Sequence, residues 1–243
     1  RNYNMTNSQR WNLVCRDLPS SQQWIDLALL SLISAALERR VWFGDKGREL
    51  YCNLFVTFVG PAGFGKTIAA KEVLRVLELV KPPKEWNRLE MDRTRSRLEV
   101  PSRFYLGPDT TTFEGLLADL AKVQSHFVLN GEKVAQRPFV LLMEELSSMF
   151  RRGHEQIPKA FLSFYDCGDY IYTPKNAESA IIRKPAVILL AGTTISFLQE
   201  AHKFGIFGDG LSSRMIWSYD NTIRTAIFDQ GALSPEQLSA RAG

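Results

Sequence analysis

A glycine-rich turn that directly follows a strand-like run is the feature that most constrains this chain. Residues 54–59, LFVTFV, are apolar and rich in β-branched and aromatic side chains, as in a buried strand. The next residues, GPAGFGKT (60–67), hold three glycines and end on Lys66 and Thr67. Residues 66–80 have a helical pattern that stops before two prolines. The sequence therefore predicts a strand, a tight turn and a helix.

The turn matches the pattern G-x-x-x-x-G-K-[ST] in full. Glycines bring the main chain close to a ligand, and consecutive N–H groups at a helix start form a nest for anions. We therefore predict a phosphate-binding loop, in which Lys66 reaches the outer phosphates and the Thr67 hydroxyl ligates Mg²⁺. The predicted binding residues are Gly60, Pro61, Ala62, Gly63, Phe64, Gly65, Lys66 and Thr67.

Four further apolar runs have the character of strands, and helical stretches separate most of them. Strands of continuous apolar character that alternate with helices indicate a parallel sheet covered on both faces. We predict an α/β fold with a mostly parallel five-stranded sheet and helices on both faces. The four further strands are expected at residues 103–107, 139–143, 186–192 and 214–219.

Two more helices and one hairpin complete the prediction. Residues 22–39 carry apolar side chains at helical spacing. Thr111 and Glu114, three residues apart, form a capping box that would start another helix. Residues 170–185 have the pattern of two short strands around a polar tip, inserted before the fourth strand. An ordinary surface hairpin would carry similar residues.

Two adjacent acids follow the third predicted strand. Hydrolysis of a bound nucleotide needs a carboxylate in the metal shell and a base that orients the attacking water. Glu145 is the candidate base and Glu144 the candidate metal ligand, because ligands of parallel sheets bind where strands end. The alternative is that one of the two acids only caps the next helix.

Threonine hydroxyls end the fourth predicted strand, and an arginine lies at the start of the fifth. Thr193 and Thr194 end the fourth strand, where a hydroxyl can position the lytic water or simply cap a helix. Arg214 precedes the fifth strand, behind a glycine-rich turn. It is expected either to reach the γ-phosphate of a neighbouring subunit or to form only a surface ion pair.

Composition excludes several other classes of protein. With 243 residues, 45% of them hydrophobic, the chain can form one large domain or one core with an appended helical segment. Its apolar runs are too short to span a membrane. Three scattered cysteines argue against a disulfide framework, and no Cys or His ligand spacing is present. Because the chain starts at Arg1 without a signal peptide, we expect a piece of a longer polypeptide or a processed one.

Positive charge is concentrated in one stretch. The chain has a formal net charge of +4, and residues 81–103 hold several more basic than acidic side chains. This stretch is either a solvated surface insertion or a segment that faces nucleic acid.

Taken in order, these motifs resemble an AAA+ ATPase, and more narrowly the helicase-type ATPase domains of phage, plasmid and mobile-element replication proteins. The matching pieces are GPAGFGKT, LLMEE, AGTTISFL and DGLSSR, and the resemblance covers about residues 20–220. Thr194 matches the sensor position and Arg214 the arginine finger. The family usually has Asp where this chain has Glu144, and its small helical lid is not evident here.

The resemblance implies an ATP- and Mg²⁺-dependent ring, commonly a hexamer, in which Arg214 acts in trans. It also implies that Lys175 and Asn176 at the hairpin tip contact single-stranded DNA, and that a primase or another replication domain is a partner. We expect a cytoplasmic protein from a bacterial, phage or plasmid context. The expected parts are an N-terminal helical segment (1–45), an AAA+ core (46–220) and a C-terminal tail (221–243).

Three functions remain open on the sequence alone. The first is a motor, an ATP-hydrolysing helicase or translocase on single-stranded DNA. The second is a nucleotide-gated assembly platform, of the transposition or antiviral-defence type, without unwinding activity. The third is a kinase that transfers phosphate to a small substrate. This function is disfavoured by the hairpin, the tandem acids and Arg214.

Overall fold

The computed structural model describes residues 5–45, 47–81, 104–107, 112–150, 156–173, 179–203, 210–222 and 234–242. Its centre is a five-stranded sheet made of β3 (Phe55–Val59), β4 (Ser125–Leu129), β5 (Glu132–Met143), β8 (Pro185–Thr193) and β9 (Ile216–Tyr219). The strand order is β4-β5-β8-β3-β9. All neighbours pair in parallel except β4 and β5, which are antiparallel. The predicted α/β class with a mostly parallel five-stranded sheet is confirmed.

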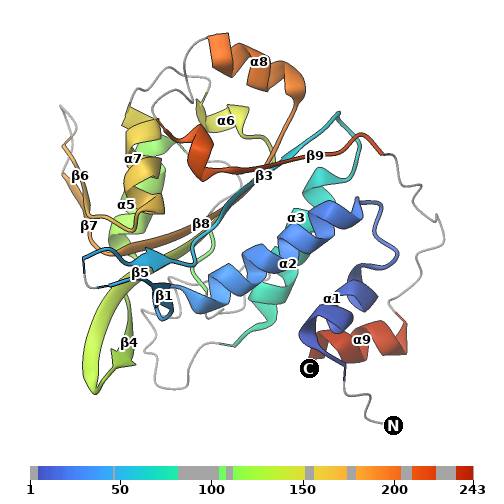
Figure 1. Ribbon diagram of the computed structural model, residues 1–243, viewed down its shortest axis with the longest axis horizontal. Helices are drawn as coiled ribbons and strands as arrows, with labels where there is room; N and C mark the ends of the chain where they lie inside the picture. Colours follow the sequence, from blue (N-terminus) through green and yellow to red (C-terminus); the bar gives the residue numbers. More distant parts are fainter. Residues whose placement is uncertain are drawn as a thin grey trace.

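Helices cover both faces of this sheet (Figure 1). One face carries α1 (Asn7–Cys15), α2 (Gln22–Leu37), α3 (Lys66–Leu79) and α9 (Pro235–Ala242). The other face carries α5 (Phe113–Lys122), α6 (Ser147–Phe150), α7 (Gln156–Tyr165) and α8 (Ile195–Lys203). The N-terminal and C-terminal helices α1 and α9 lie against each other, and both belong to the same core cluster as α3.

The alternation of side chains along each strand divides the core into two layers. Every residue of β3 and β8 is buried, as expected for strands covered on both faces. Consecutive residues then point to opposite clusters. Phe55 and Val56 of β3 lie in different clusters, and so do Leu189 and Leu190 of β8.

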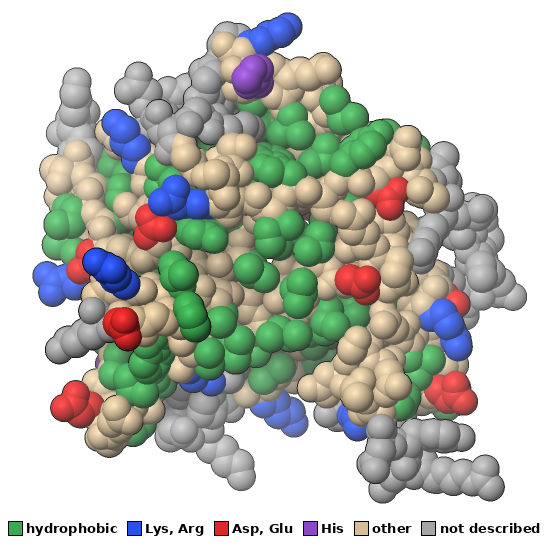
Figure 2. All heavy atoms as spheres, in the orientation of Figure 1, with side chains coloured by type: hydrophobic (Ala, Val, Ile, Leu, Met, Phe, Trp, Pro, Cys, Tyr) green, Lys and Arg blue, Asp and Glu red, His purple; other side chains and the backbone are tan. Residues whose placement is uncertain are grey.

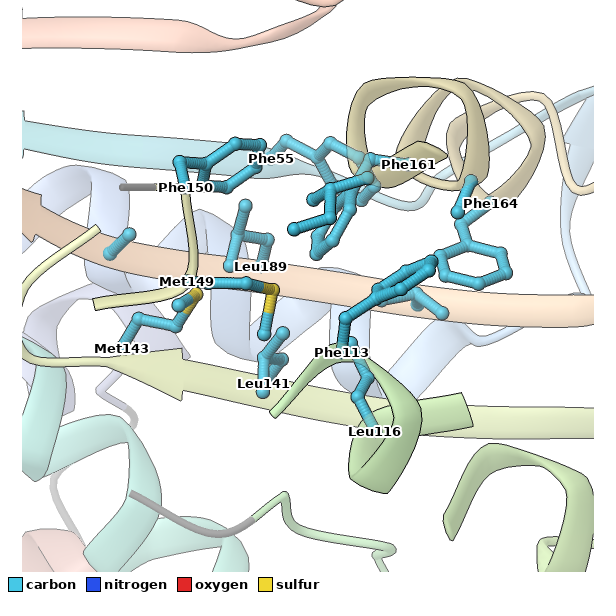
Figure 3. Packing of buried hydrophobic residues seen from close by; sticks show 14 of the residues in the cluster. Phe55, Phe113, Leu116, Leu141, Met143, Met149, Phe150, Phe161, Phe164 and Leu189 are labelled. Carbon is cyan, nitrogen blue, oxygen red and sulfur yellow. The ribbon is translucent and has the colours of Figure 1, made fainter. Parts of the chain in front are cut away.

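The layer on the α5–α8 side is rich in aromatic rings, as Figure 3 shows. Phe55 of β3 meets Phe161 of α7 edge to face, with ring centroids 5.8 Å apart. Phe161 in turn contacts Phe150 of α6 and Phe164 of α7. Such ring pairs add to the free energy of burial, so α6 and α7 are fixed to the strand that leads into the glycine-rich turn.

A long β4–β5 hairpin was not predicted. The expected strand 139–143 is only the last part of β5, which begins at Glu132 and pairs with β4. The turn between the two strands holds Asn130 and Gly131, both at positive φ (51° and 83°). Asn-Gly at such angles is the preferred two-residue hairpin turn, so the signal was present in the sequence.

The expected strand 103–107 is wrong in extent. Of the described residues there, only Leu106 forms a bridge, in parallel with Val140 of β5. Backbone hydrogen bonds from Val140 to Tyr105 and from Gly107 to Val140 hold it. This short segment pairs with the carboxyl-terminal half of β5, while β4 pairs with its amino-terminal half.

Other boundaries differ by a few residues. The helix α2 ends at Leu37 rather than at residue 39. Strand β9 begins at Ile216 rather than at residue 214, because Ser212–Arg214 form a 3-10 turn, η1. The cap of α5 is Thr112, whose hydroxyl accepts a hydrogen bond from the Gly115 N–H. The expected cap Thr111 lies outside the described residues, and glycine at the third helical position has no side chain to complete a capping box.

Two small antiparallel hairpins lie outside the central sheet. The predicted hairpin before β8 is confirmed as β6 (Tyr170–Tyr172) paired with β7 (Ala180–Ile182), and its tip, with Lys175 and Asn176, lies outside the described residues. A second hairpin, β1 (Trp42–Phe43) with β2 (Leu50–Tyr51), was not predicted. Of the basic stretch 81–103, residues 82–103 lie outside the described part.

The face seen in Figure 2 carries charges of both signs around its rim and hydrophobic side chains toward its middle. The described basic residues on this face are dispersed among acids rather than gathered in one patch. Within the described part of the chain, no helix has the length and apolar character needed to cross a bilayer.

Candidate functional site

The candidate site lies at the carboxyl edge of the three central parallel strands. The glycine-rich turn follows β3, Thr193 ends β8, and the two acids follow β5. Strand β8 lies between the other two, with Val59 opposite Thr193 and Met143 opposite Ala191. This register brings the three strand ends together at the edge where parallel sheets bind ligands.

The turn is shaped by two glycines in the left-handed region. Gly63 and Gly65 have φ of 82° and 84°, and Gly65 is the N-cap of α3. A Cβ on Gly65 would lie 1.8 Å from the carbonyl oxygen of Pro19, whereas one on Gly63 would meet nothing within 4 Å. The loop before α2 therefore packs directly on the turn, and only glycine fits at position 65.

The base of the turn is fixed to β8. The Gly60 N–H donates to the Thr193 carbonyl at 3.2 Å. A Cβ on Gly60 would lie 2.6 Å from the Asp220 carbonyl oxygen, beyond the end of β9. The turn is thus held by the ends of both strands that flank β3, so its main-chain N–H groups occupy a defined position.

Lys66 is folded back over the turn. Its ammonium donates to the carbonyl oxygens of Gly60 (2.7 Å) and Pro61 (2.6 Å), and the residue is only 8% exposed. Burial lowers the pKa of Lys66, and the negative charge of Glu145 opposes that shift. A nearly buried cation that binds two neutral carbonyls lies where an incoming anion can replace them.

Glu145 faces both β8 and the start of α6. Its Oε1 accepts hydrogen bonds from the Thr193 hydroxyl at 3.3 Å and from the Ser147 N–H at 3.4 Å. The bond to Ser147 is the helix-capping contact that the sequence left as an alternative. The bond to Thr193 and the electrostatic effect on Lys66 also place this carboxylate beside the glycine-rich turn.

Glu144 is more exposed and has a different partner. Its Oε1 lies 2.6 Å from Nζ of Lys71 in α3, and the two side chains are 45% and 42% exposed. Its backbone is closely packed, because a Cβ on Gly192 of β8 would lie 2.6 Å from the Glu144 carbonyl oxygen. The Leu146 N–H donates a hydrogen bond to the Gly192 carbonyl oxygen at 2.7 Å. This bond fixes the segment that carries both acids against β8.

The two threonines have separate contacts. Thr194 Oγ1 accepts from the Phe197 N–H at 3.4 Å and shares a hydrogen bond with the Ser196 hydroxyl. These contacts cap α8. Thr193, which is fully buried, is the hydroxyl that contacts Glu145.

Arg214 lies at the opposite edge of the sheet. Ile216, the first residue of β9, pairs with Val56 of β3, which precedes Gly60 by four residues. At about 3.3 Å per residue, the start of β9 is therefore about 13 Å from the turn along the strand direction. Arg214 lies two residues earlier still. Its guanidinium forms two hydrogen bonds with the Asp166 carboxylate, both at 3.2 Å, and contacts the Gly210 carbonyl at 3.3 Å.

Three contributors to these contacts were not identified from the sequence. Lys71 follows Thr67 by four residues, so helical geometry places both on one face of α3; that spacing was a usable signal. Pro19 and Asp166 come from loops distant in sequence, and no local pattern links them to the turn or to Arg214.

The residues present fit a nucleotide with Mg²⁺. The nearly buried Lys66 ammonium at the α3 N-terminus donates to two neutral carbonyl oxygens, and a cation at a helix start suits phosphate oxygens. Among the described residues, no group of three or more His, Cys, Asp or Glu side chains could hold a metal by itself. Mg²⁺ in phosphoryl-transfer sites is usually bound by one or two protein ligands and the phosphates, and Thr67 and Glu144 would be those ligands.

No family model matches the chain, and no curated protein is significantly similar to it.

Proposed function

We propose that this chain is an ATP-hydrolysing P-loop protein of the AAA+ type, acting as an oligomeric motor on single-stranded DNA. One observation carries the proposal. The glycine-rich turn, Lys66 and Glu145 lie together at the carboxyl edge of the parallel sheet, with Thr193 between them.

The turn supplies the binding step. Backbone N–H groups at the start of α3 would receive the phosphates, and Lys66 would exchange the carbonyls of Gly60 and Pro61 for phosphate oxygens. Thr67 and Glu144 would hold Mg²⁺, which neutralises the charge that develops during phosphoryl transfer.

Glu145 would supply the base. Its hydrogen bonds to Thr193 and Ser147 orient the carboxylate without satisfying all of its acceptor sites. A water bound to the free oxygen would be oriented for attack on the γ-phosphate. Thr194, which directly follows β8, is the proposed sensor hydroxyl.

Arg214 supports an oligomer rather than a monomer. Because it lies at the amino edge of the sheet, it is too far from the turn of its own subunit to contact a phosphate there. An arginine finger in trans would be the role that this position permits, and we propose that neighbouring subunits, commonly six, pair one turn with one Arg214.

The β6–β7 hairpin, whose tip carries the proposed DNA-binding residues, follows the partner of Arg214 closely in sequence. Asp166, the partner of Arg214, is followed within the next few residues by β6, and Asp169 accepts a hydrogen bond from the Lys184 N–H at the base of β7. The loop 166–169 therefore connects the finger to the hairpin that carries Lys175 and Asn176. A change at one subunit interface could reach the hairpin through this loop.

Release of phosphate in the presence and absence of single-stranded DNA tests the proposal. A motor hydrolyses ATP faster with DNA and unwinds a tailed duplex. Assembly on DNA with no unwinding would favour the platform function, and appearance of a phosphorylated small molecule would favour a kinase. ATP turnover that is indifferent to nucleic acid would contradict the motor.

A further inference from the structure

Lys71 occupies a specific place relative to the proposed metal ligands. It lies one helical turn after Thr67 on α3, and its ammonium is 2.6 Å from Oε1 of Glu144. Residues four apart lie on the same helix face. The Lys71 ammonium is therefore bound to one of the two side chains proposed to hold Mg²⁺, and it extends from the same helix face as the other.

A lysine ammonium and Mg²⁺ cannot both bind this carboxylate in the same way. Mg²⁺ needs oxygen ligands at about 2.0–2.1 Å in octahedral geometry. A neighbouring positive charge within a few ångströms disfavours a second cation. The Lys71 ammonium and Mg²⁺ therefore compete for Oε1 of Glu144, and the nearby charge also weakens metal binding at the other carboxylate oxygen.

The pair is weak enough to be exchanged. Lys71 and Glu144 are 42% and 45% exposed, and ion pairs of this exposure contribute little to stability because solvent screens them. The exposed ammonium has solvent into which it can move. Lys71 can thus leave Glu144 when another cation binds there.

We propose that Lys71 is a built-in counter-ion of Glu144 that competes with Mg²⁺ and leaves Glu144 when the metal–nucleotide complex binds. The inference rests on the proposed nucleotide-binding function. It assigns Lys71 as a positioning residue that sets the metal affinity of the site. The simpler alternative is a surface ion pair that only ties α3 to the end of β5.

Binding of Mn²⁺, measured by electron paramagnetic resonance at saturating ADP, tests the inference without any turnover. Lys71→Met keeps the length of the side chain and removes its charge. We expect Mn²⁺ to bind the Lys71→Met complex about 1.4- to fivefold more tightly than wild type, the factor that corresponds to a pair of this exposure. Unchanged or weaker Mn²⁺ binding would overturn the inference.

Two further variants separate competition at Glu144 from a general loss of positive charge. Lys122→Met is the matched control, because Lys122 pairs with Asp119 on α5 at 3.7 Å, away from the turn; it should leave Mn²⁺ affinity unchanged. In a Glu144→Gln background, Lys71→Met should have no effect, since the shared ligand is gone. An equal gain in that background would contradict competition at Glu144.

The outcomes also distinguish this inference from the function on which it rests. If ADP fails to bind the wild-type protein, both the nucleotide site and the role of Lys71 are wrong. If ADP and Mn²⁺ bind and Lys71→Met changes nothing, the nucleotide site stands and only the counter-ion role is lost. Thermal denaturation of Lys71→Met checks that the variant is folded.

Discussion

At the carboxyl edge of the sheet, Lys66, Glu145 and Thr193 lie within one group of strand ends, whereas at the amino edge Arg214 is paired with Asp166 beside the β6–β7 hairpin. Both regions hold cations that bind groups of their own subunit. They differ in what those cations can reach. Lys66 lies over the glycine-rich turn, while Arg214 lies just before β9, and the length of that strand separates Arg214 from the turn.

This difference suggests a division of labour. The carboxyl edge contains the groups that would bind and hydrolyse a nucleotide within one subunit. The amino edge contains a charge that would complete the site of a neighbour and a hairpin that would contact DNA. If the proposal is right, a substitution at the carboxyl edge impairs hydrolysis only in the subunit that carries it. A substitution at the amino edge impairs hydrolysis in the neighbouring subunit.

The largest expected effect is from removal of Arg214. Loss of an arginine finger lowers hydrolysis by about 10³- to 10⁵-fold, so Arg214→Ala should be nearly inactive in a phosphate-release assay and should still bind ATP. Arg48→Ala, which removes an exposed arginine of the β1–β2 hairpin outside the central sheet, is the control and should retain activity.

Mixing two inactive variants makes the same comparison sharper. Lys66→Ala and Arg214→Ala subunits, combined, should regain part of the hydrolysis, because some interfaces then pair an intact turn with an intact arginine. Recovery would be absent if Arg214 acted within its own subunit or served only as the partner of Asp166.

A slightly smaller loss is expected from Glu145→Gln. General-base groups contribute about 10²- to 10⁴-fold to rate, and the amide keeps the hydrogen bond to Thr193 without accepting a proton. ATP binding should persist, which single-turnover kinetics and equilibrium binding can separate. Hydrolysis at the wild-type rate would remove Glu145 from the proposed chemistry.

The glycines of the turn give a matched pair of stability changes. Ala at position 63 meets nothing within 4 Å and suffers only from its positive φ, which costs about 1–3 kcal/mol. Gly65→Ala adds an overlap with the Pro19 carbonyl oxygen at 1.8 Å, so the total should exceed about 4 kcal/mol.

Thermal denaturation measures this pair. For a domain of this size, each kcal/mol lowers Tm by about 2–4 °C, so Gly63→Ala should lose a few degrees and Gly65→Ala more than about 10 °C. Equal losses would show that the loop before α2 does not pack on the turn as described.

The smallest effect concerns Glu38, at the end of α2 near the amino edge. Burial raises the pKa of Glu38, against the opposing effects of Arg40 and Gln136. The folded state therefore binds a proton more tightly than the unfolded state, and stability falls as the pH rises above 4.5 through the folded pKa. Urea denaturation across this pH range should show that the free energy of unfolding falls in the wild type. The same fall should be absent in Glu38→Gln. The exposed Glu132→Gln serves as the control for removal of a surface carboxylate, and an unaltered slope in Glu38→Gln would contradict the assignment.

Much of the sheet could be predicted because its strands are continuous apolar runs. Strands β3 and β8 are buried along their whole length, so pattern and position agree. The start of β5 has two exposed residues followed by two partly buried ones, and its hairpin with β4 was missed although Asn130 and Gly131 marked the turn. Segment 104–107 was overestimated, because an apolar run cannot show how many of its residues pair.

The candidate site could be predicted only as far as local motifs extend. The turn and the two acids are contiguous in sequence, and their meeting follows from parallel strands that end at one edge. Contacts between distant segments carried no such signal. Lys71 with Glu144, Asp166 with Arg214, and Pro19 with Gly65 depend on how helices and loops pack over the sheet.

Calorimetric titration with a non-hydrolysable ATP analogue and Mg²⁺ tests the central claim most directly. We predict saturable heat with one site per subunit, and at least about a tenfold loss of affinity in Lys66→Ala, since charge-assisted bonds to phosphate are lost. No heat with the folded wild-type protein, or equal affinity in both proteins, would contradict nucleotide binding at this turn.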